Sequence, residues 1–385
     1  MTDSVKAPYH PEHATAQEIM QQPATWRKTL LLIEQQRDRI NTFLTPLLAR
    51  TDLRIILTGA GTSAFIGKIL VPALLPKLNL RVEAIATTDL VSNPREYLSA
   101  HCPTLLVSFG RSGNSPESVA AIELANQMLG QCFHLIITCN ERGRLHQNFA
   151  QSANTLSLLT PPETHDRGFA MTSSVSNMML ACLAVFAPRQ YNLASFLPII
   201  ENSQNIIEQY LQRPTSLFGQ DEYHRVVYLG SGGLQGIAQE SALKILELTA
   251  GKISTFFDSP TGFRHGPKSI VDGNTLVVVF ISNSPYTRKY DLDLLAELRN
   301  DNVARRVVAI ADSPVPGIGK GEYLYLPKTT HADDAHIGFC YLLYAQIYAY
   351  LTSLQSGASP DNPSPSGVVN RVVEGVVIHR LEIEK

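Results

Sequence analysis

Charge is scarce in this sequence of 385 residues, and neither sign predominates. Lys, Arg, Asp and Glu make up 17% of the chain, and the formal net charge is −2, with no basic tract. Such a surface gives nucleic acid and anionic membranes no electrostatic attraction. Cysteine is also sparse: the five cysteines are odd in number and show no C-x-x-C spacing. They indicate reduced thiols, neither a disulfide framework nor a zinc site, so we expect a cytoplasmic protein.

Long apolar runs are missing as well. The most apolar stretch, residues 338–351, is short and contains Gln346 and four tyrosines, whereas a membrane span needs about 18 apolar residues. Residues 1–23 are polar and lack the apolar core of a secretory signal. What is present is an ordinary globular balance, with 44% hydrophobic residues and a length that suits two domains of about 150 residues each.

The chain contains an internal repeat. Three segments recur in the same order at an offset of 171 or 172 residues. Their order and shared spacing indicate a duplicated domain. The pairs are 54–67 (RIILTGAGTSAFIG) with 225–238 (RVVYLGSGGLQGIA), 104–109 with 275–280, and 135–140 with 307–312.

Each repeated segment is a short β-branched run bounded by Gly, Ser, Asn or Asp, which is typical of a strand buried on both faces. Helical stretches lie between them, such as residues 116–129 and 292–298. This alternation predicts an α/β fold of two tandem domains, each a parallel sheet flanked by helices, a flavodoxin-like αβα sandwich. Ligands of such sheets bind at the carboxyl ends of the strands.

The expected domain bounds follow from the repeat. Residues 13–50 have a helical pattern, and residues 356–366 form a Pro/Ser/Gly-rich linker. We expect a helical arm over 1–50, a first domain over 51–215, a second over 216–357 and a tail near the active site over 358–385.

Residues 110–117 (GRSGNSPE) follow a strand and precede a helix. Glycine lets the backbone approach an anion, the helix N-terminus supplies N–H groups, and Ser112, Ser115 and Arg111 add donors. The alternative is a polar turn whose serine caps the helix. The second copy reads ISNSPY at 281–286 and has lost the glycines. This asymmetry favours a phosphate-binding loop, with Gly113 at its turn, in the first copy alone.

Residues 59–64 (GAGTSA) match the G-x-G-x-x-A pattern of a dinucleotide site. The next strand, residues 82–88 (VEAIATT), ends in threonines, where a dinucleotide site has an acidic residue for the ribose. We therefore expect no cofactor. Thr62 and Ser63 are instead candidate hydroxyl donors to the same phosphate-bearing ligand.

Residues 239–247 (QESALKILE) are strongly helical, and Glu240, Lys244 and Glu247 share one face. The simpler interpretation is a solvated face whose salt bridge is worth about 0.3–0.5 kcal/mol. His265 lies nearby in residues 262–267 (GFRHGP), where a structural role is the alternative to a catalytic one. A carboxylate and a histidine beside a phosphate loop are what proton transfer on a sugar phosphate requires.

Residues 331–336 (HADDAH) could suggest a metal site. Acidic residues that begin a helix and solvated histidines explain the pattern more simply. We expect no metal.

Together these motifs resemble the SIS (sugar isomerase) family, over nearly the whole chain from about residue 50. The segments that carry the resemblance to the isomerase half of glucosamine-6-phosphate synthase are 61–63, 112–115, 240–247, 265–267 and, against its V-A-S-T segment, 169–172. By this resemblance Glu247 transfers a proton between C1 and C2, with Lys244 and Glu240 beside it. His265 assists ring opening across a subunit interface, which implies a homodimer or higher oligomer with shared active sites.

The resemblance also implies the substrate contacts. Ser63, Ser112 and Ser115 match residues that hold the phosphate. The further candidates for substrate binding are Thr62, Arg111, Gly113, Phe169, Ala170 and Arg371.

Two departures from the synthase pattern define the expected reaction. The synthase has an N-terminal glutaminase domain, whereas this chain has about 50 residues before its first strand. We therefore expect no ammonia from glutamine, and a reaction that runs from amino sugar to ketose or exchanges ketose and aldose. The synthase's tail lysine has no equivalent, and nearby Arg371 cannot act as a neutral amine. The tail resembles that of AgaS-type galactosamine-6-phosphate deaminase/isomerases.

The sequence thus predicts conversion of D-galactosamine 6-phosphate to D-tagatose 6-phosphate and ammonia. Glu247 would need a raised pKa, while Lys244 would keep Glu240 ionised. One alternative is a tagatose-6-phosphate ketose/aldose isomerase. The other is a non-catalytic regulator that senses phosphosugars, although the presence of both Glu247 and His265 argues against it.

Overall fold

The computed structural model describes residues 10–212, 217–218, 222–327, 329, 332–373 and 375–382. The chain divides into two compact units, each built around one sheet. The β1–β5 unit comprises Ala24–Asp166, Ser173–Leu193 and the chain from Ser366 onward. The β6–β10 unit comprises the chain up to Pro23, Arg167–Thr172 and Ala194–Pro365. The domain bounds expected from the sequence stay a prediction.

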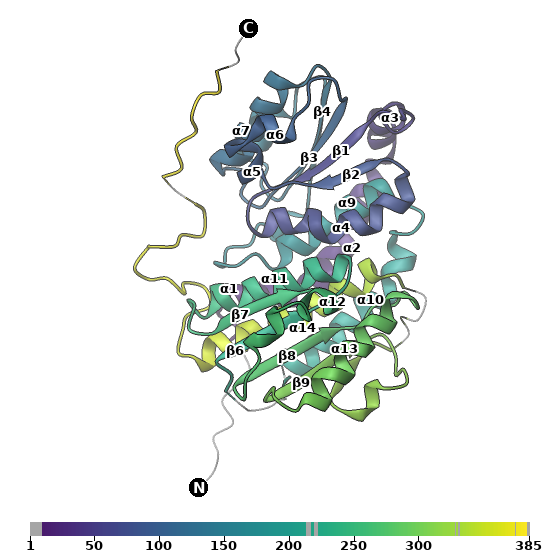
Figure 1. Cartoon of the computed structure of the whole chain (residues 1–385). Coiled ribbons are helices and arrows are strands. Elements are labelled where there is room, and N and C mark those ends of the chain that lie inside the picture. Colours follow the sequence, from purple (N-terminus) through teal and green to yellow (C-terminus); the bar gives the residue numbers. More distant parts are fainter. Residues whose placement is uncertain are drawn as a thin grey trace. The chain divides into compact units, whose positions relative to one another are not determined.

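The sheet of the β1–β5 unit has five parallel strands in the order β2-β1-β3-β4-β5 (Figure 1). This order is the flavodoxin-like one. The strands are β1 (Arg54–Thr58), β2 (Arg81–Ala84), β3 (Thr104–Gly110), β4 (Cys132–Thr138) and β5 (Thr155–Leu159).

The sheet of the β6–β10 unit repeats that topology, with the order β10-β9-β8-β6-β7 and all strands parallel. The predicted duplication of an α/β domain is therefore confirmed. The strands are β6 (Arg225–Leu229), β7 (Ser254–Asp258), β8 (Thr275–Phe280), β9 (Arg306–Ala311) and β10 (Tyr323–Tyr325).

Helices cover the sheets, and the central strands β3 and β8 are therefore buried along their whole length. In the first unit, α7 (Pro116–Met128) packs Ala121, Ile122 and Ala125 into the core. In the second, α13 (Thr287–Asp301) packs three leucines onto the valines of β6 and β8. Other short elements are α5 (Thr87–Ser92), α6 (Pro94–Tyr97), α8 (Arg144–Phe149), η1 (Pro162–Thr164), α10 (Leu193–Ile206), η2 (Ile207–Gln212), α12 (Pro260–Phe263), η3 (Pro267–Ile270) and η4 (Ile318–Lys320).

Glycine turns start the corresponding helices α4 (Thr62–Leu78) and α11 (Gly233–Leu248). Their N-caps, Gly61 and Gly232, have φ of 55° and 57° with ψ of −128° and −125°, a backbone region that suits glycine. A Cβ at Gly59 would lie 2.6 Å from Ser63. The repeated glycines thus place each helix N-terminus directly beyond the end of its strand.

Residues 338–351 belong to a longer helix, α14 (Asp334–Gln355). Its 22 residues are long and apolar enough to cross a membrane by length and composition alone. The expectation that no stretch comes near that threshold was therefore wrong. However, 89% of its most apolar window is buried inside the protein, as in the core helix of a soluble domain.

Residues 13–50 are helical as expected, in α1 (Ala14–Met20), α2 (Gln22–Gln35) and α3 (Arg37–Leu48). Asp361 caps α1, since its carboxylate accepts the backbone N–H groups of Ala14 and Thr15, both at 2.8 Å. In the β1–β5 unit, the indole of Trp26 donates to Ser176 of α9 (Ser173–Phe186) at 2.8 Å.

The tail from Ser366 has no helix or strand among its described residues. It is held to the β1–β5 unit by side chains that bind its backbone. Gln127 donates to the carbonyl of Leu381 at 3.2 Å, and Arg95 to that of Glu382 at 2.7 Å.

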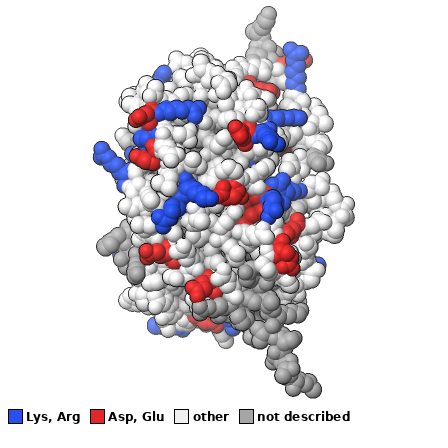
Figure 2. Space-filling view, turned by 180° about the vertical axis from the view of Figure 1, so that it is seen from behind, with Lys and Arg blue, Asp and Glu red and all other residues white. Residues whose placement is uncertain are grey.

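On the face seen in Figure 2, basic and acidic side chains are interspersed.

Candidate functional site

The loop between β3 and α7 turns at Gly113. Gly113 has a φ of +63°, and a Cβ there would lie 3.3 Å from Gly143 and from the hydroxyl of Thr138. Hydrogen bonds from the next loop fix its backbone, because Asn140 donates to the carbonyl of Ser112 at 2.8 Å and the N–H of Leu145 to that of Gly113 at 2.9 Å. Only glycine fits here at low cost.

Ser115 stands at the N-cap of α7, yet its hydroxyl makes no capping hydrogen bond. It lies 2.6 Å from the hydroxyl of Ser118 instead. The hydroxyl of Ser112 accepts the N–H of Asn114 at 3.2 Å. The alternative of a simple capping serine is therefore not what the structure shows. In the first turn of α7, Pro116 has no N–H, and the N–H groups of Ser118 and Val119 donate to the carbonyl of Ser115. The N–H of Glu117 has no backbone partner among the described residues.

Arg111 is buried, and it donates to the backbone carbonyl of Arg371 at 2.8 Å. Arg371 in turn donates to the carbonyl of Asp166. The tail thus places a second guanidinium close to Arg111 and the loop after β3 within the β1–β5 unit. Burial, together with Arg371 and Arg111, lowers the pKa of His165, so this histidine is neutral beside two cations.

The corresponding loop of the second copy, residues 281–286, is filled by the protein's own carboxylates. Asp291 accepts the N–H of Ser282 at 2.9 Å and the hydroxyl of Ser231 at 2.5 Å. Asp334 accepts the N–H of Asn283 at 2.6 Å and the hydroxyl of Ser282 at 2.6 Å.

Burial raises the pKa of Asp291 to about 6, although its hydrogen bonds from Ser231 and Ser282 oppose that shift. The N–H groups and the hydroxyl of this loop that an anion would need already donate to these two aspartates. This loop differs from that of the first copy, as the lost glycines indicated. Asp291 had no motif around it, and Asp334 was expected only as an acidic residue that begins a helix.

Glu240 and Lys244 of α11 are fully buried, and the side chain of Glu247 is 26% exposed. The interpretation of a solvated helix face was therefore wrong. The Lys244 ammonium lies 2.6 Å from Glu247 Oε2 and 3.2 Å from Glu240 Oε1. Burial opposes its charge, but the two carboxylates outweigh burial and raise the pKa of Lys244. One carboxylate of this ion triad, that of Glu247, reaches the surface of its unit.

His265 is exposed, and its ring makes no hydrogen bond to any residue that the structure describes. Its neighbours are anchored, because Glu297 of α13 binds both Arg264 (2.7 Å) and Lys268. Lys268 also lies 2.5 Å from Asp301. The loop is thus clamped on both sides of a histidine whose ring is accessible.

The segment Arg167–Thr172, which carries Phe169 and Ala170, belongs to the β6–β10 unit. The buried carboxylate of Glu18 in α1 accepts the N–H groups of Arg167 and Gly168 at 2.5 and 3.1 Å. Glu18 had no motif around it, so sequence reasoning missed this anchor.

The predicted site residues thus divide between the two units. The β1–β5 unit holds Thr62, Ser63, Arg111, Ser112, Gly113, Ser115 and Arg371; the β6–β10 unit holds Phe169, Ala170, Glu240, Lys244, Glu247 and His265. His331 lies outside the described residues, within which no group of three potential metal ligands occurs.

A family model for the SIS domain matches residues 47–188 and 221–355, one match to each repeat. The chain belongs to the SIS domain family. It is 57% identical to the D-galactosamine-6-phosphate deaminase AgaS of Escherichia coli, over 95% of both chains. These findings confirm the predicted family and its predicted branch.

A solved structure and a more distant relative are also similar to this chain. The crystal structure of a tagatose-6-phosphate ketose/aldose isomerase from Escherichia coli superposes with a TM-score of 0.92 and 53% identity, covering 97% of this chain and 98% of that one. A glutamine–fructose-6-phosphate aminotransferase of Pseudomonas putida is 27% identical over 68% of this chain and 42% of its own length.

Proposed function

We propose that this SIS-domain protein is an enzyme that converts D-galactosamine 6-phosphate and water to D-tagatose 6-phosphate and ammonia. The observation that carries the proposal is the 57% identity, over 95% of both chains, to the AgaS deaminase of Escherichia coli. The buried ion triad of α11 supports it, because a charged group is expensive to bury and such groups gather at sites of chemistry.

Phosphate binding is assigned to the loop after β3. The N–H of Glu117 in the first turn of α7 and the hydroxyls of Ser112 and Ser115 suit a phosphate dianion. Thr62 and Ser63, in the first turn of α4, are assigned to the same substrate. Arg111 and Arg371 add positive charge nearby.

The chemistry is assigned to the β6–β10 unit. His265 transfers a proton as the sugar ring opens. Glu247 then takes the proton from C2 of the amino aldehyde, giving an enolate, and returns it to C1. One N–H proton of the amine moves to O1, which gives a ketimine. Water adds to the C2 carbon of the ketimine and ammonia leaves, which yields the ketose. Lys244 keeps Glu240 ionised and orients Glu247.

The second candidate is ketose/aldose exchange on tagatose 6-phosphate, favoured by the solved structure with that activity in its name. It uses the same groups without nitrogen. Ammonia release therefore separates the two reactions.

The test is a panel of galactosamine 6-phosphate, glucosamine 6-phosphate, their N-acetyl forms and tagatose 6-phosphate. We expect the highest kcat/KM, with ammonia and tagatose 6-phosphate as products, on galactosamine 6-phosphate. Aldose formation from tagatose 6-phosphate without ammonia from any amino sugar would replace the proposal with the isomerase.

We further propose a cytoplasmic homodimer in which His265 serves the partner's site. The accessible ring of His265 supports this, and all five cysteines are free thiols. Mixing Glu247→Gln with His265→Ala subunits would then restore about a quarter of wild-type activity, since half the dimers are mixed and each has one intact site. No recovery after verified subunit exchange would assign His265 to its own chain.

A further inference from the structure

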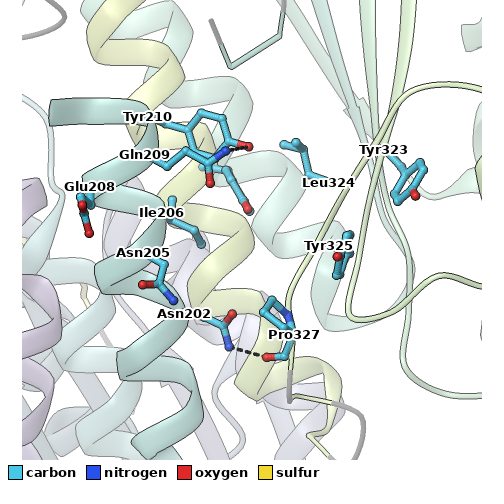
Figure 3. Close-up of a pocket in the computed structure, with 11 residues that line it drawn as sticks. Asn202, Asn205, Ile206, Glu208, Gln209, Tyr210, Tyr323, Leu324, Tyr325 and Pro327 are labelled. Atoms are coloured by element: carbon cyan, nitrogen blue, oxygen red, sulfur yellow. Dashed lines mark hydrogen bonds between the residues drawn. The ribbon is translucent and has the colours of Figure 1, made fainter. Parts of the chain in front are cut away.

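The β6–β10 unit contains a pocket that the proposed reaction does not use. Its volume is about 740 Å³, within the range of small-molecule sites. Figure 3 shows its two sides: Asn202, Asn205, Gln209 and Tyr210 come from α10 and η2, and Leu324, Tyr325 and Pro327 from the segment that begins with β10.

The lining has a particular chemistry. The lining residues that the structure describes combine tyrosines and side-chain amides and include no Lys or Arg; Glu208 is the charged residue among them. A phosphate or carboxylate would meet the negative charge of Glu208 here. Aromatic rings with carboxamides suit a neutral ligand that has an apolar face and many hydroxyls.

Polar groups in the pocket are available to such a ligand. Asn205 and Tyr325 are exposed, and neither forms a hydrogen bond to any residue within the described ranges. Asn202 is buried and fixed, because its amide donates to the carbonyls of Pro198 and Pro327, both at 2.8 Å. The pocket thus has a rigid floor and two adaptable polar side chains.

The helix changes form where it enters the pocket. The α-helix α10 ends at Ile206, and η2 is a π-helix over Ile207–Gln212. A π-helix is rare and occurs frequently at functional sites, since it shifts the side chains that follow. Here it contributes Gln209 and Tyr210, whose side chains form a hydrogen bond of 3.1 Å.

From this lining and this helix we propose that the pocket binds an uncharged hexose in its ring form, apart from the phosphosugar site. The tyrosines stack on the sugar ring, and the amides bind its hydroxyls. The inference does not depend on the proposed deaminase reaction.

The test is a titration of the full chain with D-galactose by saturation-transfer NMR. A ligand of about a dozen non-hydrogen atoms should bind with a Kd on the order of 1 mM. Tyr325→Ala and Asn205→Ala should each weaken binding at least about tenfold. The matched controls Tyr286→Ala and Gln204→Ala, which alter exposed residues outside the lining, should leave it unchanged.

Three results would overturn the inference. One is no binding at concentrations well above this Kd. Another is binding that survives Tyr325→Ala but is lost in Ser112→Ala, which would assign the sugar to the phosphosugar site. The third is a change in oligomeric state, by size-exclusion chromatography, in both Tyr325→Ala and Asn205→Ala, which would make this face an interface between copies.

Discussion

The surroundings of Lys244 bear most directly on the proposed chemistry. Its ammonium has no exposure to water and is balanced by Glu240 and Glu247. Removing ions from water costs several kcal/mol per ion, and replacement of such groups by apolar side chains is often neutral or stabilising. The triad therefore adds little to stability, which agrees with a role in proton transfer.

Substitution of Ser112 tests the proposal that the loop after β3 binds the phosphate. Ser112→Ala should raise KM by roughly 10- to 100-fold, the loss expected for one hydrogen bond to a charged group, and leave kcat nearly unchanged because phosphate contacts persist through the reaction. Steady-state kinetics on galactosamine 6-phosphate would measure both constants, with Ser152→Ala, an exposed serine of the same unit, as control. A drop in kcat alone would remove Ser112 from phosphate binding.

At the scale of elements, the loop around His265 depends on α13. Glu297 binds Arg264 and Lys268, which flank the histidine. These ion pairs are partly exposed, so each contributes at most about 1 kcal/mol, yet together they restrict where the ring can lie.

Glu297→Ala should therefore lower kcat roughly 3- to 10-fold with little change in KM, since about 1 kcal/mol corresponds to a factor of 5. Asp293→Ala, an exposed residue of the same helix, is the control. Thermal unfolding would separate positioning of His265 from general destabilisation. If Tm and activity fell in parallel in both variants, Glu297 would stabilise the unit and would not position His265.

The loop of the second copy makes a prediction about pH. Because the pKa of Asp291 is raised to about 6, the folded state binds its proton more tightly than the unfolded state does. The stability that this group contributes is then greatest at low pH and falls as the pH rises from about 4 to about 6. Ser231, Ser282, Asp334 and Arg288 are the groups that face it.

Asp291→Asn cannot ionise, so the difference in Tm between the wild type and this variant should decrease over that pH window. Asp293→Asn, which changes an exposed residue of α13, should show no such trend. A difference that grows with pH would mean that the native state favours ionised Asp291.

Much of the element order was predictable from the repeat, because glycine turns and buried β-branched runs are local signals. The strands β1, β3, β4, β6, β8 and β9 and the helices α7, α11 and α13 lie where the pattern placed them. Burial of Glu240 and Lys244 was not predictable, because α14 covers α11 from about a hundred residues away; a Cβ on Gly338 would lie 3.3 Å from Ile237. Glu18 and Gly168, which also form a hydrogen bond, lie even farther apart in sequence.

At the scale of the whole molecule, the two copies of the duplicated domain carry different functional groups. The first copy keeps the glycine loop that we propose binds phosphate, whereas carboxylates of the second copy bind the N–H groups of the equivalent loop. The second copy has the ion triad of α11 and the loop of His265. Each unit thus holds a different part of the groups that the proposed reaction needs.

The most direct test of this account follows the proton from C2. Galactosamine 6-phosphate labelled with deuterium at C2 should yield ammonia and tagatose 6-phosphate in equal amounts, with part of the deuterium at C1 of the ketose by mass spectrometry or NMR. Glu247→Gln should slow both products by roughly 10²- to 10⁴-fold, the usual contribution of a general acid/base. Ketose formed without ammonia, or a Glu247→Gln variant with the wild-type rate, would contradict the account.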